Sequence, residues 1–183
     1  MQVWVRLFRV GWRALRHSGT ENAAFRSRLI FRVAPGDIDV NLHMNNGRYL
    51  TIMDLGRIDI LIRTGLWRQM RRQRLQGVVA SQRIRYRHAL DPWDRFRLDS
   101  RILGWNDEGL IFDHRMMRIR GTEEKLAAAA TTRFVFVNRG RGKPKTSDIL
   151  ASAGIDGESP ALSDEILTWL TAEKRLASTR LTD

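Results

Sequence analysis

The chain lacks cysteine altogether and has only four prolines and two tyrosines among its 183 residues. Without cysteine there are no disulfide bonds, no thiolate nucleophile and no cysteine-based zinc site, which fits a reducing compartment. No apolar run approaches the roughly 18 residues that a membrane-spanning helix needs. Negative charge is also scarce, because 20 acidic residues face 32 lysines and arginines, a net charge of +12. This excess favours anionic partners, although a charge that serves only solubility explains it equally well.

Residues 1–20 predict a basic amphipathic helix. Arginines recur there at steps of three and four residues: Arg6, Arg9, Arg13 and Arg16. A helix gathers them on one face and leaves Trp4 and Trp12 on another. Charges inside the apolar stretch argue against a cleavable signal peptide. Two interpretations stay open, namely peripheral membrane contact through residues 1–18 and docking on the protein's own sheet or a partner subunit.

Residues 21–140 predict one α+β domain. A strand over 27–33 ends at a Pro-Gly turn, and a helix over about 48–64 is apolar nearly all round, which marks it as buried. Gly56 in this helix permits close packing on a sheet, and Gly65 is a suitable C-cap. Four more strands follow with turn-like separators: 78–88, 96–105, 110–120 and 126–137. Short loops and one-sided patterning predict an antiparallel sheet wrapped around the single helix.

The remaining segments are basic connectors and a last helix. Residues 67–74 predict a connector rich in arginine. Residues 141–183 predict a basic linker followed by a helix from 164 to 177, with Leu167, Trp169 and Leu170 as its docking residues.

A polar stretch stands directly ahead of the buried helix. Its members are Asp37, Asp39, Asn41, His43, Asn45 and Asn46. A helix start offers unpaired N–H groups and partial positive charge, so it can hold a developing oxyanion. A carboxylate such as Asp39 can attack a carbonyl or activate a water there, and a thioester needs little more because its thiol leaves readily. Ordinary turn and cap chemistry is the alternative for both aspartates.

Other catalytic patterns are missing from the sequence. It has no Gly-x-Ser-x-Gly elbow, no His-Glu-x-x-His and no phosphate-binding loop. The four histidines lack the spacing of metal ligands. We therefore expect neither a metal site nor a cofactor.

The segment Asp-Ile-Asp-Val-Asn-Leu-His-Met-Asn-Asn-Gly-Arg-Tyr, from Asp37 to Tyr49, resembles the hotdog-fold acyl-CoA thioesterase superfamily. It looks most like the 4-hydroxybenzoyl-CoA thioesterase type and the branch of thioesterase superfamily member 6. The resemblance extends to residues 54–57, 90–92 and 103–105 and covers about 25–138. It implies a hotdog fold, a five-stranded antiparallel sheet around a central helix, flanked here by the terminal helices. It also implies a homodimer, with a tetramer left open, and an acyl-CoA or acyl carrier protein substrate.

The resemblance assigns roles residue by residue. It implies Asp39 as nucleophile or base, Asn41 and His43 as assistants, and the backbone N–H near Asn46 as the oxyanion donor. It implies that Asp37, Asn45 and Tyr49 support the loop and shape the substrate pocket. Arginines of the second strand, with the linker over 139–145, are candidates for binding coenzyme A phosphates: Arg83, Arg85 and Arg87. A solvated basic face is the alternative for each arginine.

The leading hypothesis is therefore hydrolysis of fatty or aromatic acyl thioesters. One alternative is a hotdog enoyl-thioester hydratase or dehydratase, because Asp39 and His43 echo its acid–base pair, although His43 stands one residue too close. Another is a non-catalytic, membrane-associated dimer that binds acyl thioesters or lipids. Nucleic-acid binding ranks last because no aromatic stacking platform accompanies the arginines. We expect a cytoplasmic protein, with peripheral attachment to the inner face of a membrane as the alternative.

Overall fold

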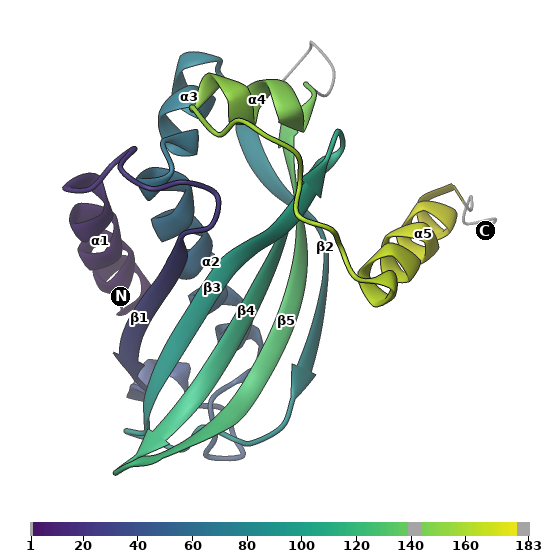
Figure 1. Cartoon of the computed structure of the whole chain (residues 1–183). Helices are drawn as coiled ribbons and strands as arrows, with labels where there is room; N and C mark the ends of the chain where they lie inside the picture. Colours follow the sequence, from purple (N-terminus) through teal and green to yellow (C-terminus); the bar gives the residue numbers. More distant parts are fainter. Residues whose placement is uncertain (1, 139–143, 179–183) are drawn as a thin grey trace.

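The computed structural model of the chain describes residues 2–138 and 144–178. A single antiparallel sheet of five strands curves around helix α2 (Asn46–Arg63), which lies behind the sheet in Figure 1. The strands are β1 (Arg26–Arg32), β2 (Gln76–Tyr86), β3 (Arg95–Asn106), β4 (Gly109–Arg120) and β5 (Glu123–Val137). Their order is β1-β3-β4-β5-β2, so β1 and β2 form the two edges. The predicted sheet and its central helix are confirmed.

Helix α2 is buried because its apolar side chains meet the concave face of the sheet. Ile52, Met53 and Leu55 pack in one core cluster with residues of β1, β3 and β4. Gly56 faces β3 so closely that an added Cβ would lie 2.2 Å from the Ser100 hydroxyl oxygen. The expectation that Gly56 permits close packing on the sheet is therefore confirmed. Thr64 is the C-cap of the helix, and Gly65 follows with φ of +78°, a left-handed conformation that glycine adopts without strain.

Two buried clusters of hydrogen-bonded side chains join α2 to the sheet. In the first, the Ser27 hydroxyl donates to Asp59 (2.6 Å), which also accepts from Arg63 (3.0 Å). In the second, Arg57 approaches His114 Nε2 (3.4 Å), while Nδ1 of the same ring lies 2.8 Å from the Ser100 hydroxyl oxygen. Burial, and then the positive charge of Arg57, lower the pKa of His114 to about 3. His114 is therefore neutral at pH 7; Nε2 accepts and Nδ1–H donates to Ser100.

The predicted N-terminal helix is present as α1 (Gln2–Leu15), which packs against α2 beside β1 (Figure 1). The basic connector expected over 67–74 is mostly helical, which was not predicted from the sequence. Those residues belong largely to helix α3 (Leu66–Arg72), whose Leu66 and Met70 are buried in the second core cluster. A segment of seven residues with two buried apolar side chains is too short for its periodicity to predict a helix that tertiary packing stabilises.

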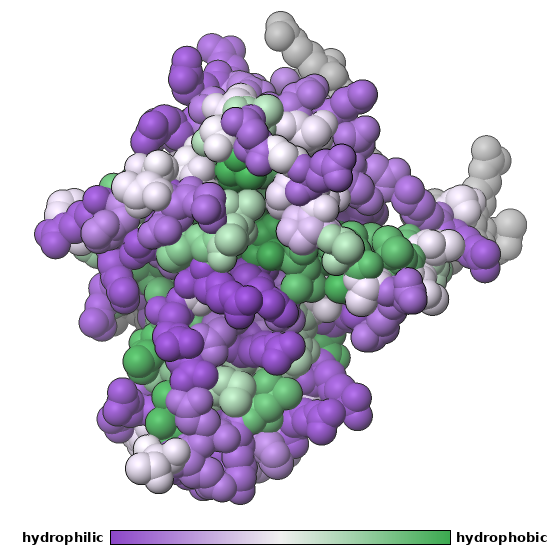
Figure 2. Space-filling model, in the orientation of Figure 1, coloured by the Kyte–Doolittle hydropathy of each residue, from purple (hydrophilic) through white to green (hydrophobic). Residues whose placement is uncertain are grey.

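Two helices follow the sheet, namely α4 (Thr146–Ser152) and α5 (Asp164–Ser178). The C-terminal helix was predicted, whereas α4 was not; linker residues 139–143 lie outside the described part of the chain. Helix α5 docks through Ile166 and Leu170 against Ile111, while Leu167 is 47% exposed, so its prediction as a docking residue is wrong. Figure 2 shows hydrophobic side chains gathered where α5 meets the sheet, beside hydrophilic ones that run across the strands.

Candidate functional site

The loop before α2 is closed on itself by a bridge between Ile38 and Met44. Within it, the Asp39 N–H donates to the His43 carbonyl (2.9 Å), and the Asp39 carbonyl accepts from the Leu42 N–H (3.1 Å). One oxygen of the Asp39 carboxylate accepts from the Asn41 N–H (2.9 Å), the pattern of an Asx turn. The bond from Asn41 occupies Asp39 Oδ1, and among the described residues no hydrogen bond to Asp39 Oδ2 is present.

The start of α2 is capped by Asn45. Its side-chain oxygen accepts from the Gly47 N–H (2.9 Å), and its carbonyl accepts from the Arg48 N–H (2.8 Å). Within residues 2–138 and 144–178, nothing accepts a hydrogen bond from the N–H of Asn46. The Asn46 carbonyl accepts from the Tyr86 hydroxyl (3.1 Å) at the end of β2. The first turn of α2 therefore presents one free donor where the helix dipole adds positive charge.

A cavity of about 280 Å³ opens between this loop, the helix start and the end of β2. Its lining residues are Asp39, Asn41, His43, Met44, Asn46, Tyr49, Tyr86, Arg87, His88 and Ala89. Six of the residues expected from the sequence thus line one space, including Asp39, Asn46 and Arg87. The carboxylate and the helix start share a common cavity.

Tyr86 lines the cavity although it was not predicted from the sequence as a site residue. The Tyr86 ring meets the Tyr49 ring edge-on with 5.1 Å between centroids. Burial raises the pKa of both phenols above the ordinary value, so both stay protonated at neutral pH. The signal in the sequence was the spacing of Tyr86 from Ile84. Residues two apart on a strand face the same side, and Ile84 packs on the core.

His43 stands at the edge of the cavity with half of its side chain exposed. Its Nε2 lies 3.5 Å from a carboxylate oxygen of Asp91, which is paired in turn with Arg120. The imidazole is therefore oriented by a carboxylate from the loop before β3.

Some of the expected site residues lie away from this cavity. Asp37 is buried and paired with Arg6 (2.7 Å), which places it beneath the loop. Asn45 is engaged in capping α2. Arg83 and Arg85 line a separate space on the other face of the sheet, where Arg83 pairs with Glu165 (3.0 Å) and lies over the Trp169 ring. Of the three candidate arginines in β2 and just after it, only Arg87 reaches the cavity of Asp39.

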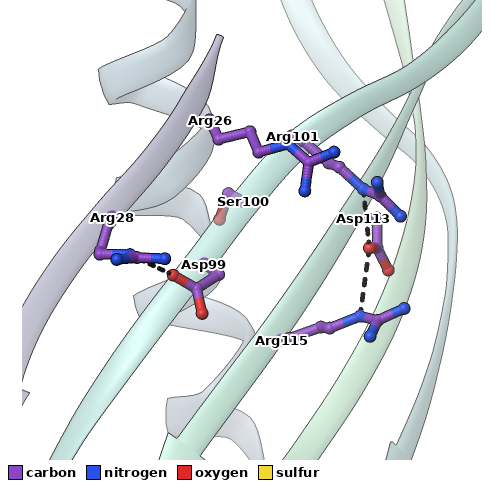
Figure 3. Close-up of a pocket in the computed structure, with 7 residues that line it drawn as sticks. All are labelled: Arg26, Arg28, Asp99, Ser100, Arg101, Asp113 and Arg115. Atoms are coloured by element: carbon purple, nitrogen blue, oxygen red, sulfur yellow. Dashed lines mark hydrogen bonds and ion pairs between the residues drawn. The ribbon is translucent and has the colours of Figure 1, made fainter. Parts of the chain in front are cut away.

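A larger cavity of about 350 Å³ lies on the outer face of the sheet (Figure 3). Four arginines from three strands line it with two aspartates: Arg26, Arg28, Arg101, Arg115, Asp99 and Asp113. Ser100 and His114 are buried against α2, so their strand neighbours Asp99 and Asp113 point to the opposite face. The sheet therefore separates this basic cavity from the site at Asp39. Sequence patterning gave no signal for it beyond the general excess of arginine.

No group of three or more candidate ligands for a metal ion occurs in the described part of the chain. None of the helices formed by these residues has the length and hydrophobicity to cross a bilayer.

Residues 33–170 match the family described as the thioesterase-like superfamily. Protein THEM6 of Xenopus laevis is 29% identical over 138 residues, which cover 75% of this chain and 64% of the relative. Thioesterase lcsJ of Purpureocillium lilacinum is 24% identical over 143 residues, which cover 67% of this chain and 46% of the relative. The chain thus spans less than two thirds of the length of these two curated relatives.

The fold is also similar to that of solved structures. The 4-hydroxybenzoyl CoA thioesterase from Pseudomonas sp. strain CBS-3 matches with a TM-score of 0.63 at 19% identity, covering 71% of this chain and 99% of that chain. An identity this low supports similarity of fold alone. The five-stranded sheet around α2 is accordingly a hotdog fold, as the resemblance in the sequence implied.

Proposed function

The chain belongs to the thioesterase-like superfamily, and from this premise we propose that it hydrolyses acyl-CoA thioesters at the cavity of Asp39. One observation carries the proposal. A carboxylate, Asp39, and an unpaired backbone donor, the N–H of Asn46, line the same cavity at the start of α2. Ester cleavage needs these two elements, a nucleophile or base and a donor for the oxyanion.

The reaction follows from this arrangement. The thioester carbonyl oxygen accepts from the Asn46 N–H, so negative charge that develops on it meets the positive end of the helix dipole. The free oxygen of Asp39 attacks the carbonyl carbon and forms a mixed anhydride, or it removes a proton from a water that attacks instead. The C–S bond breaks and the coenzyme A thiolate leaves, then takes a proton from solvent. In the first route, water hydrolyses the anhydride and regenerates Asp39.

Neighbouring residues support this chemistry in our proposal. The Asn41 N–H holds one oxygen of Asp39 and leaves the other for the reaction. Asp91 orients His43 at the cavity edge, where the imidazole can relay a proton from solvent to the departing thiolate. Tyr49 and Tyr86 shape the wall on the opposite side. Arg87 provides a positive charge for a phosphate of coenzyme A.

We further propose that the active unit is a homodimer formed through β2. This strand is a sheet edge, and Val78 and Val79 are 42% and 37% exposed on it. An exposed apolar edge strand is a template for pairing with a second copy. Because Tyr86 ends β2 and lines the cavity, such pairing would bring the partner subunit to the mouth of the site.

The test is thiol release from a panel of acyl-CoAs with fatty and aromatic acyl groups. We expect Asp39→Asn and Asp39→Ala to lower the rate about 10²–10⁴-fold, the usual contribution of such a group. Asp156→Asn is the matched control, since Asp156 is exposed and far along the chain from the cavity. No turnover by the wild-type protein with any acyl chain, or equal rates for all four proteins, would refute the proposal.

Three further readouts separate the alternatives. Loss of enoyl absorbance with crotonyl-CoA would indicate a hydratase instead of a hydrolase. Tight binding of acyl-CoA without turnover would indicate a binding protein. Single turnover in ¹⁸O-water distinguishes the two hydrolytic routes, because attack by Asp39 itself leaves label in the enzyme's carboxylate.

A further inference from the structure

Helix α1 has two apolar faces, and only one of them is covered. Val10 and Ala14 are buried against the core. The opposite face carries a stripe of large apolar residues, which we call the outer stripe: Trp4 (74% exposed), Val5 (55%), Phe8 (70%), Trp12 (56%) and Leu15 (57%). Single exposed apolar residues are normal, but five on one short helix form a contiguous patch, and such patches mark interaction sites.

A basic border runs along the outer stripe. It consists of Arg9, Arg13 and Arg16, and α1 contains no acidic residue. Arg16 lies over the Trp12 ring, 5.6 Å from its centroid. Within the part of the chain that the structure describes, Arg9 and Arg13 have no hydrogen bond or ion pair. Arg6 differs from them because it pairs with Asp37 beneath the helix.

Arg9 and Arg13 also border a groove between α1 and β1. The groove has a volume of about 160 Å³ and is lined on the strand side by Leu29, Ile30 and Phe31. Ile30 is 55% exposed and extends the apolar surface beyond the helix. The two guanidinium groups thus meet an apolar floor, an arrangement suited to an anionic headgroup with its alkyl chains alongside.

We propose that the outer stripe docks α1 in the interface of an anionic phospholipid bilayer. Tryptophan and phenylalanine favour the boundary between headgroups and acyl chains, and arginine binds lipid phosphates. A helix of 14 residues, about 21 Å long, lies along the surface without crossing it. The negative charge of such a bilayer complements the net charge of +12 that the protein carries.

A second copy of the chain fits this surface less well. In a two-fold contact between α1 helices, the border arginines of one copy would face those of the other. No acidic side chain of α1 is available to offset that repulsion. An anionic bilayer satisfies the apolar stripe and its basic border together.

The test is co-sedimentation of the full chain with vesicles, without substrate. We expect binding to vesicles of phosphatidylcholine and phosphatidylglycerol, at least tenfold weaker binding to phosphatidylcholine alone, and a decrease as salt increases. Phe8→Asp, Trp12→Asp and the pair Arg9→Glu with Arg13→Glu should each weaken binding at least tenfold. The matched control is Leu176→Asp on α5, because Leu176 is as exposed as Phe8, at 71% against 70%. Circular dichroism establishes that each variant is folded.

The outcomes are decisive in both directions. Failure of the wild-type chain to sediment with anionic vesicles overturns the proposal, as does undiminished binding by Phe8→Asp and Trp12→Asp. A wild-type dimer that ignores vesicles and dissociates in Phe8→Asp would assign the stripe to a second copy instead. Asp39→Asn should bind vesicles as the wild type does, so this test is independent of the proposed catalysis.

Discussion

Arg6 donates two hydrogen bonds to the Asp37 carboxylate, at 3.0 and 2.7 Å, and so fastens α1 to the loop that carries Asp39. The two residues are 31 positions apart in the chain. Asp37 is almost fully buried, at 1% exposure, and also accepts from the Ala34 N–H. The carboxylate two residues before the proposed nucleophile therefore stabilises the structure of the loop.

Replacing Arg6 by leucine should destabilise the fold, because it leaves the Asp37 carboxylate buried without its partner. Breaking a buried pair in this way costs about 3–5 kcal/mol in the free energy of unfolding, and the partial exposure of Arg6 favours the lower end. Urea denaturation measures the change. Arg9→Leu is the control on the same helix, because Arg9 has no ion pair among the described residues. Equal denaturation midpoints for the two variants would contradict the prediction.

Gly56→Ala should destabilise the protein, although alanine normally favours a helix. Its new Cβ would lie 2.2 Å from the Ser100 hydroxyl oxygen, and such overpacking costs about 1–3 kcal/mol. Gly11→Ala is the matched control in α1, where nothing lies within 4 Å of the added Cβ. There we expect a gain of about 0.5–1 kcal/mol, from helix propensity alone. Thermal or chemical unfolding of both variants tests the opposite signs.

Acidification should weaken the fold through His114. Its pKa is lowered to about 3 in the folded state by burial and by Arg57, whereas in the unfolded chain it is near 6.5. The unfolded chain therefore takes up a proton that the folded protein refuses, so stability is complete above pH 6.5 and falls as pH decreases toward 3. The slope from this group approaches about 1.4 kcal/mol per pH unit.

His114→Gln removes that contribution while keeping a polar side chain near Ser100. The free energy of unfolding of the variant should depend less on pH between 6.5 and 4 than that of the wild type. Parallel curves over this range would show that His114 is not the source of the slope.

Tyr86→Phe should lower kcat by about fivefold with little change in KM. The hydroxyl that it removes holds the Asn46 carbonyl, and losing one hydrogen bond costs about 1 kcal/mol, which corresponds to that factor. The proposed oxyanion donor is the N–H of Asn46 itself, so its position becomes less fixed when the carbonyl loses this bond. Steady-state kinetics with the best acyl-CoA measures the effect, and an unchanged kcat would mean that the hydroxyl does not position the helix start.

Local patterns in the sequence were enough to predict much of the fold. The apolar helix around Ile52, the alternating strands and Gly56 each carry a signal within a few residues. The polar segment from Asp37 to Tyr49 likewise marked the loop and the helix start, because capping and turn chemistry is local.

The remaining features depend on contacts between distant segments. Tyr86 reaches Asn46 only because β2 ends beside the start of α2, and Asp37 meets Arg6 only after α1 has docked. Helix α3 forms because Leu66 and Met70 enter a core built by other elements. Periodicity within one segment contains none of this information.

The polar contacts between α2 and the sheet also determine how the helix is rotated about its own axis. The Ser27 hydroxyl reaches Asp59, and Arg57 reaches His114, at one rotation and one axial position of the helix, since a change in either would break both contacts with the sheet. An interface of leucine and isoleucine alone would tolerate small slips along the sheet. Polar groups in the middle of the helix therefore determine the direction in which the Asn46 N–H points at its start.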